Sequence, residues 1–196
     1  MKKLSPLVRT LIIIGGLIII GFLYYKGLYN KEVALNQKVK GQWANVESSY
    51  QRRIDLIPNL VNTVKGYADY EKETLTQVIE ARAKATSVNI DAGNLNAENF
   101  AQFQQAQEGL TSALSRLLMV VERYPELKAN QNFLELQAQL EGTENRINVE
   151  RNRYNEAVKD YNAFILKLMV KILFSKEELP YFKAQEGASV APKVEF

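Results

Sequence analysis

The side chains that most often carry out catalysis near neutral pH are missing from this sequence. It contains no cysteine and no histidine, which removes thiol nucleophiles, zinc-thiolate sites and the most common general base and metal ligand. Acidic pairs such as Glu71 and Glu73 are present, but di-iron helical bundles also need Glu-x-x-His motifs. We therefore expect a protein that is not an enzyme and that binds no metal or cofactor. The remaining enzymatic alternative is an activity based on carboxylates or lysines.

One short stretch, RRIDLIPN at residues 52–59, concentrates the polar residues of greatest chemical interest. In a first interpretation, Arg52, Arg53 and Asp55 form a solvent-exposed face. Asp55 would then pair with Arg52, three residues earlier, and this pair would contribute only a few tenths of a kcal/mol. In a second interpretation, the arginine and aspartate side chains are partly buried and fasten one helix to another. Composition alone favours the first.

Pro58 lies inside a run that otherwise has the pattern of a continuous helix. A proline in a helix interior removes one backbone hydrogen bond and clashes with the carbonyl group four residues earlier, here that of Ile54, at a cost of about 3 kcal/mol. One interpretation is a tolerated kink, in which Asn59 or a water molecule satisfies the freed carbonyl. The other is a hinge that bends the helix relative to a membrane.

The amino-terminal segment has the composition of a membrane-spanning helix. Residues 11–25 carry no charge, and only a few polar residues and Arg9 interrupt the longer apolar stretch of residues 4–25. A bilayer core needs roughly 20 helical residues, so we expect residues 4–25 to cross the lipid bilayer once. The bulky and charged residues that follow do not fit a signal-peptide cleavage site. This indicates an uncleaved anchor.

The positive charge of the chain lies at its amino terminus. Lys2, Lys3 and Arg9 are the only charged side chains before residue 26, which leaves 22 of the 25 basic residues against all 22 acidic ones. The positive-inside rule therefore favours a cytoplasmic amino terminus, with the following domain outside. The balanced charge of that domain offers no basic surface for nucleic acid. No nucleic-acid partner is expected.

After the anchor, apolar residues recur every three or four positions in three runs, which is typical of amphipathic helices. These runs predict one helix over about residues 30–86, a second over about 100–121 and a third over about 133–172. Helices of this length bury their apolar sides only by packing side by side. The predicted fold is all-α, with an N-terminal transmembrane helix followed by an antiparallel bundle of three to four long helices. An apolar stripe that the shorter second helix leaves uncovered would favour self-association.

These features divide the chain into three parts. They are a transmembrane anchor at residues 1–29, a long-helix bundle at residues 30–174 and a C-terminal tail at residues 175–196. The tail contains two prolines and has no sustained apolar period, so we expect an extended or flexible arm. Tyr181 and Phe182 are the residues able to dock it against the bundle.

Long segments of this sequence resemble the LemA family. The resemblance includes the N-terminal span, YNKEV at 29–33, the segment 52–82 that begins RRIDLIPNLVN, the segment 124–162 that begins YPELKANQNF, and the closing YF and APKVEF. The positions that match the family's motifs are Arg52, Arg53, Asp55, Pro58, Asn59, Tyr124, Pro125, Asn132, Arg151, Tyr154, Asn155 and Asn162. All of these except Asn132 are predicted inter-helix or assembly contacts. The resemblance moves the interpretation of the two arginines and the aspartate toward packing between helices.

What the resemblance implies is a membrane-anchored bacterial helical bundle without established catalytic activity and with no agreed cofactor. Some relatives are associated with membrane organisation, including magnetosome formation, and others are encoded near membrane proteases. We therefore predict a non-enzymatic scaffold or interaction protein in the bacterial cell membrane, which acts by forming a homo-oligomer or by binding another envelope protein. The alternative is a regulatory adaptor of a membrane protease.

One departure from the family pattern lies near the end of the last predicted helix. Relatives commonly have Phe-Pro and a glycine-containing apolar stretch there, whereas this sequence runs FILKLMVKILFSKEELPYF at residues 164–182. We therefore expect the last helix to continue straight to about residue 174. A role of the family's loop in membrane contact or partner binding is left without support in this chain.

Overall fold

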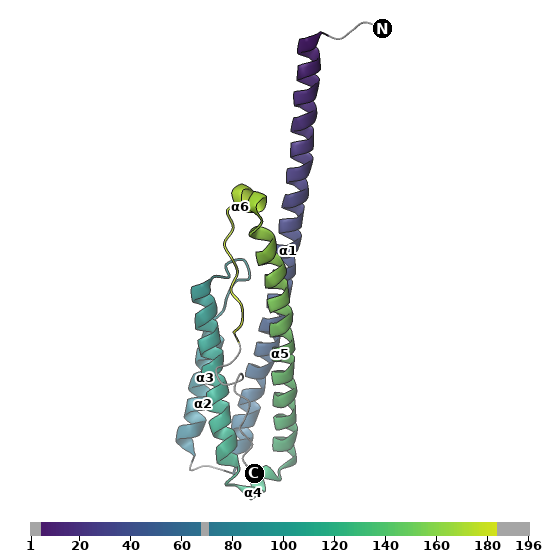
Figure 1. The fold of residues 1–196 in the computed structure, drawn as a ribbon. Helices are drawn as coiled ribbons and strands as arrows, with labels where there is room; N and C mark the ends of the chain where they lie inside the picture. Colours follow the sequence, from purple (N-terminus) through teal and green to yellow (C-terminus); the bar gives the residue numbers. More distant parts are fainter. Residues whose placement is uncertain (1–4, 68–70, 184–196) are drawn as a thin grey trace, which may run out of the picture.

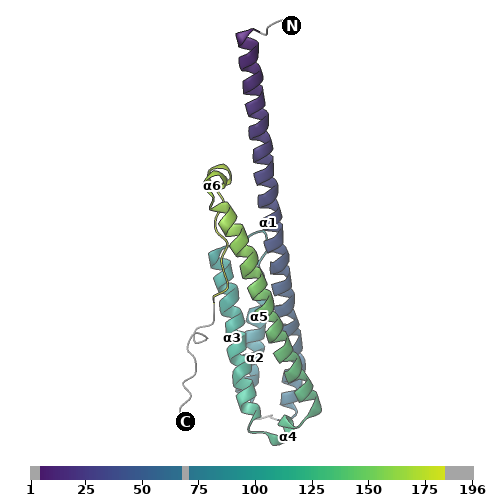
Figure 2. The ribbon, with the colours of Figure 1, turned by 45° about the vertical axis from the view of Figure 1, so that its right-hand side comes forward.

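The computed structural model describes residues 5–67 and 71–183, and within them all regular structure is helical (Figure 1). The helices are α1 (Pro6–Lys65), α2 (Lys72–Ser87), α3 (Ala97–Val121), α4 (Pro125–Lys128), α5 (Gln131–Ile165) and α6 (Leu168–Phe174). Helices α1, α2, α3 and α5 run alternately down and up as an antiparallel bundle, with α4 at one end and α6 at the other (Figures 1 and 2). The prediction of an all-α bundle behind a long apolar N-terminal helix is confirmed.

Helix α1 runs from the apolar N-terminal segment into the bundle without a break. It has 60 residues, which corresponds to about 90 Å at 1.5 Å per residue. Ser5 caps its start by accepting a hydrogen bond from the backbone N–H of Val8. Among the described residues, its apolar part is the one segment long and apolar enough to cross a membrane, and none of that segment is buried. From Val39 onward, the helix buries an apolar face in the core.

The expected single helix over residues 30–86 is wrong, because the chain reverses between α1 and α2. Helix α1 ends at Lys65, α2 begins at Lys72, and α2 packs back along α1. The pattern misled because Val64 and Leu75 belong to the same buried cluster and are eleven residues apart, which is close to three helical turns. A straight helix and a helical hairpin therefore have the same apolar period at this place.

The buried core has two parts, with Arg53 of α1 between them. The part nearer the candidate span is aromatic: the ring centre of Trp43 lies 5.8 Å from that of Phe100, 5.6 Å from that of Tyr154 and 6.1 Å from that of Phe182. The more distant part is mainly aliphatic and draws on α1, α2, α3, α4 and α5. The tail therefore contributes to the core through Phe182, whereas Tyr181, the other residue that the sequence offered for docking, is exposed.

Helix α5 does not continue straight to residue 174, contrary to expectation. It ends at Ile165, and Lys167 adopts an extended backbone before α6 begins at Leu168. Helix α6 ends at Phe174, and the next residue, Ser175, has a left-handed backbone with a φ of 45° and a ψ of 45°. Residues 176–183 then run back beside α5 without regular secondary structure (Figure 2). The rest of the predicted tail, residues 184–196 with the APKVEF match, lies outside the described residues.

Candidate functional site

Two asparagines of α5 hold the described part of the tail by acting like backbone groups. Asn162 donates from Nδ2 to the carbonyl oxygen of Leu179 and accepts from the N–H of the same residue, both at 2.9 Å. Asn155 forms the same pair of hydrogen bonds with Phe182, again both at 2.9 Å. Each carboxamide therefore satisfies both polar backbone groups of one tail residue, as a neighbouring strand does in a sheet.

The spacing of these two asparagines fits an extended chain. Asn155 and Asn162 are seven residues apart, which is about 10.5 Å along a helix. Leu179 and Phe182 are three residues apart, which is about 10 Å in an extended chain. Two turns of α5 thus match three extended residues of the tail, which runs antiparallel to the helix.

Two further α5 side chains bind the same segment. The Tyr154 hydroxyl donates to the carbonyl oxygen of Pro180 at 3.1 Å, and burial raises the pKa of this phenol, so it remains a donor at neutral pH. Arg151 donates from Nη2 to the carbonyl oxygen of Lys183 at 2.8 Å, and its guanidinium lies 4.8 Å from the ring centre of Phe182. We call these four α5 residues the tail-binding face: Arg151, Tyr154, Asn155 and Asn162. The sequence predicted these residues as inter-helix or assembly contacts, and in the structure they contact the chain's own tail.

Arg53 joins three helices in the middle of the bundle. Its Nη1 donates to Thr111 Oγ1 and pairs with Glu144 Oε2, both at 3.0 Å, while its Nη2 donates to Gln107 Oε1 at 2.7 Å. The guanidinium also lies 5.0 Å from the ring centre of Tyr50. Thr111 and Gln107 belong to α3 and Glu144 to α5. The interpretation in which a buried charged side chain fastens one helix to another therefore applies to Arg53.

The other two charged residues of that stretch lie at the surface. Arg52 and Asp55 are exposed, and among the described residues they do not form an ion pair with each other. Asp55 instead accepts a hydrogen bond from Gln51 at 2.7 Å. Consecutive residues of this stretch therefore lie on different sides of α1, with Arg53 in the core and Arg52 in solvent.

The carbonyl group that Pro58 frees has a partner on another helix. Arg82 of α2 donates from Nε to the carbonyl oxygen of Ile54 at 3.2 Å, and α1 continues past the proline to Lys65. Asn59, which the sequence offered as a partner, is exposed. The proline therefore creates an acceptor that ties α2 to α1. Sequence reasoning missed Arg82, because a side chain that bonds to a distant backbone group leaves no local pattern.

Tyr124 and Pro125 lie at the turn between α3 and α5. The Tyr124 hydroxyl donates to Glu71 Oε1 at 3.1 Å, and the same carboxylate oxygen pairs with Arg123 at 3.0 Å. Pro125 starts α4, and the nearby Asn132 is exposed. Helix α4 lies at the end of the bundle that is farthest from the candidate span (Figure 1).

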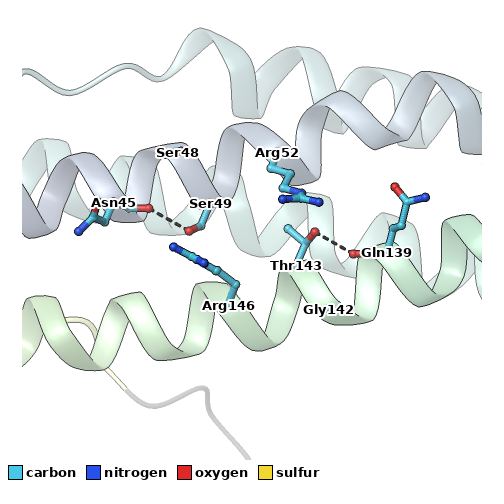
Figure 3. A pocket seen from close by; sticks show the side chains of 8 residues that line it. All are labelled: Asn45, Ser48, Ser49, Arg52, Gln139, Gly142, Thr143 and Arg146. Atoms are coloured by element: carbon cyan, nitrogen blue, oxygen red, sulfur yellow. Dashed lines mark hydrogen bonds between the residues drawn. The ribbon is translucent and has the colours of Figure 1, made fainter.

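A groove of about 440 Å³ lies between α1 and α5, and sequence reasoning did not predict it. Two arginines enter it from opposite helices, Arg52 from α1 and Arg146 from α5 (Figure 3). We call it the arginine groove; its lining residues are Asn45, Ser48, Ser49, Arg52, Gln139, Gly142, Thr143 and Arg146. Guanidinium groups bind carboxylates and phosphates through paired hydrogen bonds. The arrangement is therefore able to hold an acidic group.

Two of the hydroxyl groups in the arginine groove are already engaged. Ser49 donates to the carbonyl oxygen of Asn45 at 2.9 Å, and Thr143 donates to that of Gln139 at 2.8 Å (Figure 3). Arg146 also lies 3.4 Å from the buried carboxylate of Glu150 on its own helix. The two guanidinium groups are the charged groups of the groove, and no catalytic pair of nucleophile and base lines it within the described residues.

A buried carboxylate lies where α1 leaves the bundle. Glu32 accepts hydrogen bonds from the Tyr161 hydroxyl and from Asn36, both at 3.4 Å, and lies 3.8 Å from the Lys176 ammonium. Burial and the neighbouring Glu32 charge raise the pKa of Tyr161 to about 12. This contact connects α1, α5 and the start of the tail.

The raised pKa of Tyr161 predicts a loss of stability in alkali. In the unfolded chain a tyrosine ionises near pH 10, so its contribution to stability is complete below about pH 10 and is lost as the pH rises through about 12. We expect Tyr161→Phe to show a smaller fall in melting temperature than the unmodified chain between these pH values. The measurement is thermal unfolding in detergent followed by circular dichroism. Tyr181→Phe, at an exposed tyrosine, is the control, and an equal fall in all three proteins would contradict the prediction.

Comparisons with known proteins agree with the sequence resemblance. Protein LemA of Metamycoplasma hominis is 21% identical over 162 residues, which cover 82% of this chain and 70% of that protein. Magnetosome protein MamQ 2 of Paramagnetospirillum magneticum is 25% identical over 179 residues, with 82% of this chain and 65% of the relative covered. Magnetosome protein MamQ of Magnetospirillum gryphiswaldense is 25% identical over 158 residues, which cover 71% of this chain and 57% of that protein. The chain thus spans less than two thirds of these MamQ relatives.

The sequence model of the LemA family matches residues 42–196. This range contains Arg53 with its partners on α3 and α5, the arginine groove and the whole tail-binding face. It is well over half of the chain. The chain belongs to the LemA family.

Proposed function

We propose that this chain is a non-enzymatic, membrane-anchored helical scaffold that binds another protein of the bacterial envelope, or a second copy of itself, at a fixed distance from the membrane. The observation that carries the proposal is the unbroken course of α1 from the candidate span into the core. A bundle joined to its anchor by one helix holds its surface in a set position, which suits assembly. The names of the MamQ relatives support the proposal, because they refer to a cellular structure, the magnetosome.

The arginine groove is the proposed contact surface for the partner. Ser49 is 24 residues beyond Tyr25 on the same helix, which places the groove about 36 Å from the end of the candidate span. Lipid headgroups do not extend that far from a bilayer. We therefore propose that the acidic group bound by the two arginines is an aspartate or glutamate side chain of a partner protein.

Site-specific photo-crosslinking of the full chain in its native membranes tests this proposal. A photoreactive amino acid at Gln139, an exposed residue of the arginine groove, should give a crosslinked product that mass spectrometry identifies. The same amino acid at Glu80, an exposed residue of α2, is the matched control and should give little product. The double charge reversal Arg52→Glu, Arg146→Glu should reduce the Gln139 product about tenfold.

The possible products separate the candidate functions. A product made of two copies of this chain, or of this chain with an envelope protein, supports the scaffold. A membrane protease in the product would support the alternative role as a regulatory adaptor. Absence of any product at either position, together with a monomeric mass in detergent, would contradict the proposal as a whole.

A further inference from the structure

Helix α6 carries an apolar surface that the bundle leaves uncovered. Leu168 and Ile172 are 74% and 67% exposed, and Met169 and Leu173 are also exposed. At 100° per residue, these four side chains fall within an arc of about 140° on one side of the helix. On the other side, Val170 is buried against the core. The helix is thus apolar toward the bundle and apolar toward its surroundings.

Aromatic contacts fix α6 beside the end of the candidate span. The ring centre of Phe174 lies 5.6 Å from that of Tyr25 and 6.3 Å from that of Tyr29. Tyr25 is the last residue of the uncharged segment of α1, where tyrosines commonly lie at a membrane-water interface. Both ribbon views place α6 at the end of the bundle from which the apolar part of α1 projects (Figures 1 and 2). A bilayer crossed by α1 therefore has its surface at the level of α6.

The charges around α6 also suit a membrane surface. Lys167 and Lys171 lie at and within the helix, Lys176 follows it, and Lys26 and Lys31 occupy the adjacent part of α1. The neighbouring acidic residues are fewer, and they are Glu32, Glu177 and Glu178. Glu32 is buried and forms an ion pair with Lys176. The excess of lysines favours anionic headgroups, with about 1 kcal/mol for each basic residue near such a surface.

From these three observations we propose that α6 lies in the membrane interface as a second contact with the bilayer, with Leu168, Met169, Ile172 and Leu173 inserted between headgroups and acyl chains. Interfacial helices of this kind bury their apolar face about 5–10 Å into the headgroup boundary. The proposal requires that α1 crosses the membrane and does not depend on any partner at the arginine groove. It assigns a membrane role to the segment that departs from the family pattern.

Lipid quenching of a single labelled position tests the proposal, and the absence of native cysteine makes the labelling specific. Ile172→Cys in the full chain is labelled with a fluorescent dye and reconstituted into vesicles of phosphatidylcholine and phosphatidylglycerol with brominated acyl chains. We expect about twofold quenching relative to vesicles of unbrominated lipid. Lys171→Cys, exposed on the same helix but outside the apolar arc, and Gln139→Cys in the bundle should be quenched much less. Leu17→Cys inside the candidate span reports correct insertion.

The label at Leu17 reports whether the candidate span is inserted in the bilayer, whatever the position of α6. Quenching at Leu17 without quenching at Ile172 would overturn the proposal. Shielding of Ile172 that grows with the protein-to-lipid ratio, without quenching by lipid, would assign the surface to a second copy of the chain and would equally overturn it. Met169→Cys provides a second position with the same expectation, so that a local effect of one label does not decide the result.

Discussion

Replacing Arg53 with alanine is expected to lower the free energy of unfolding of the bundle by about 3 kcal/mol. The side chain is 3% exposed, and its ion-pair partner Glu144 is 38% exposed. Alanine removes the bonds to Thr111 and Glu144 and leaves the buried Gln107 without its charged donor. Because Glu144 regains water, the cost stays near the lower end of the range for broken buried pairs. Denaturant unfolding of the full chain in detergent, followed by circular dichroism, measures it.

The adjacent arginine provides a matched control for this experiment. Arg52→Ala removes the same side chain from an exposed position of the same helix, and we expect a change within about 0.5 kcal/mol. Arg53→Lys keeps the charge but replaces the planar fork by one ammonium group, so it should recover only part of the loss. Equal losses in Arg52→Ala and Arg53→Ala would show that Arg53 does not join the helices.

Replacing Phe182 with alanine is expected to release the tail from the bundle. Its ring centre lies 6.1 Å from that of Trp43, 4.6 Å from that of Phe100 and 5.4 Å from that of Tyr154. Removal of a buried phenylalanine costs about 3–5 kcal/mol. Because the ring makes its contacts only when the tail is docked, the substitution destabilises the docked tail relative to the released tail by this amount. At 1.4 kcal/mol for each factor of ten, the released fraction should rise at least about a hundredfold.

Limited trypsin digestion of the full chain measures this release through cleavage after Lys183, whose carbonyl group Arg151 holds in the docked tail. Tyr181→Ala changes the exposed residue directly before Phe182 and should leave the cleavage rate near that of the unmodified chain. Asn155→Ala, which removes two backbone hydrogen bonds and keeps the aromatic ring, should have an intermediate rate. Similar rates for the Phe182 and Tyr181 variants would mean that the ring does not hold the tail.

Helical content was predictable because it depends on local periodicity, whereas the places where helices end were less so. The spacing of Tyr161, Ile165, Leu168 and Ile172 continues one helical stripe, yet the helix breaks at residues 166 and 167. After the break, Ile172 is exposed although it continues the stripe. A periodic pattern records that a residue is apolar, but it does not distinguish contact with a protein core from contact with lipid.

The candidate site was predictable in part for a similar reason. Arg53 follows Tyr50 by three residues and precedes Ile57 by four, so its place on the core face is a local property of the helix. The shared face of Asn155 and Asn162 follows from their spacing of two turns. What lies against that face depends on the return of the tail past α6, and this is a tertiary event without a local signal. The same holds for Arg82 and for the arginine groove.

The absence of a break in α1 also has a mechanical consequence. Along a continuous helix each residue adds about 1.5 Å and about 100° of rotation. A partner that contacts both the span and the bundle therefore meets them at a fixed angle, and one residue inserted between Tyr25 and Leu28 would turn that angle by about 100°. An insertion of seven residues would nearly restore the angle while it moves the bundle about 10.5 Å outward. A rotation of the candidate span about the axis of α1 would therefore turn the arginine groove through the same angle.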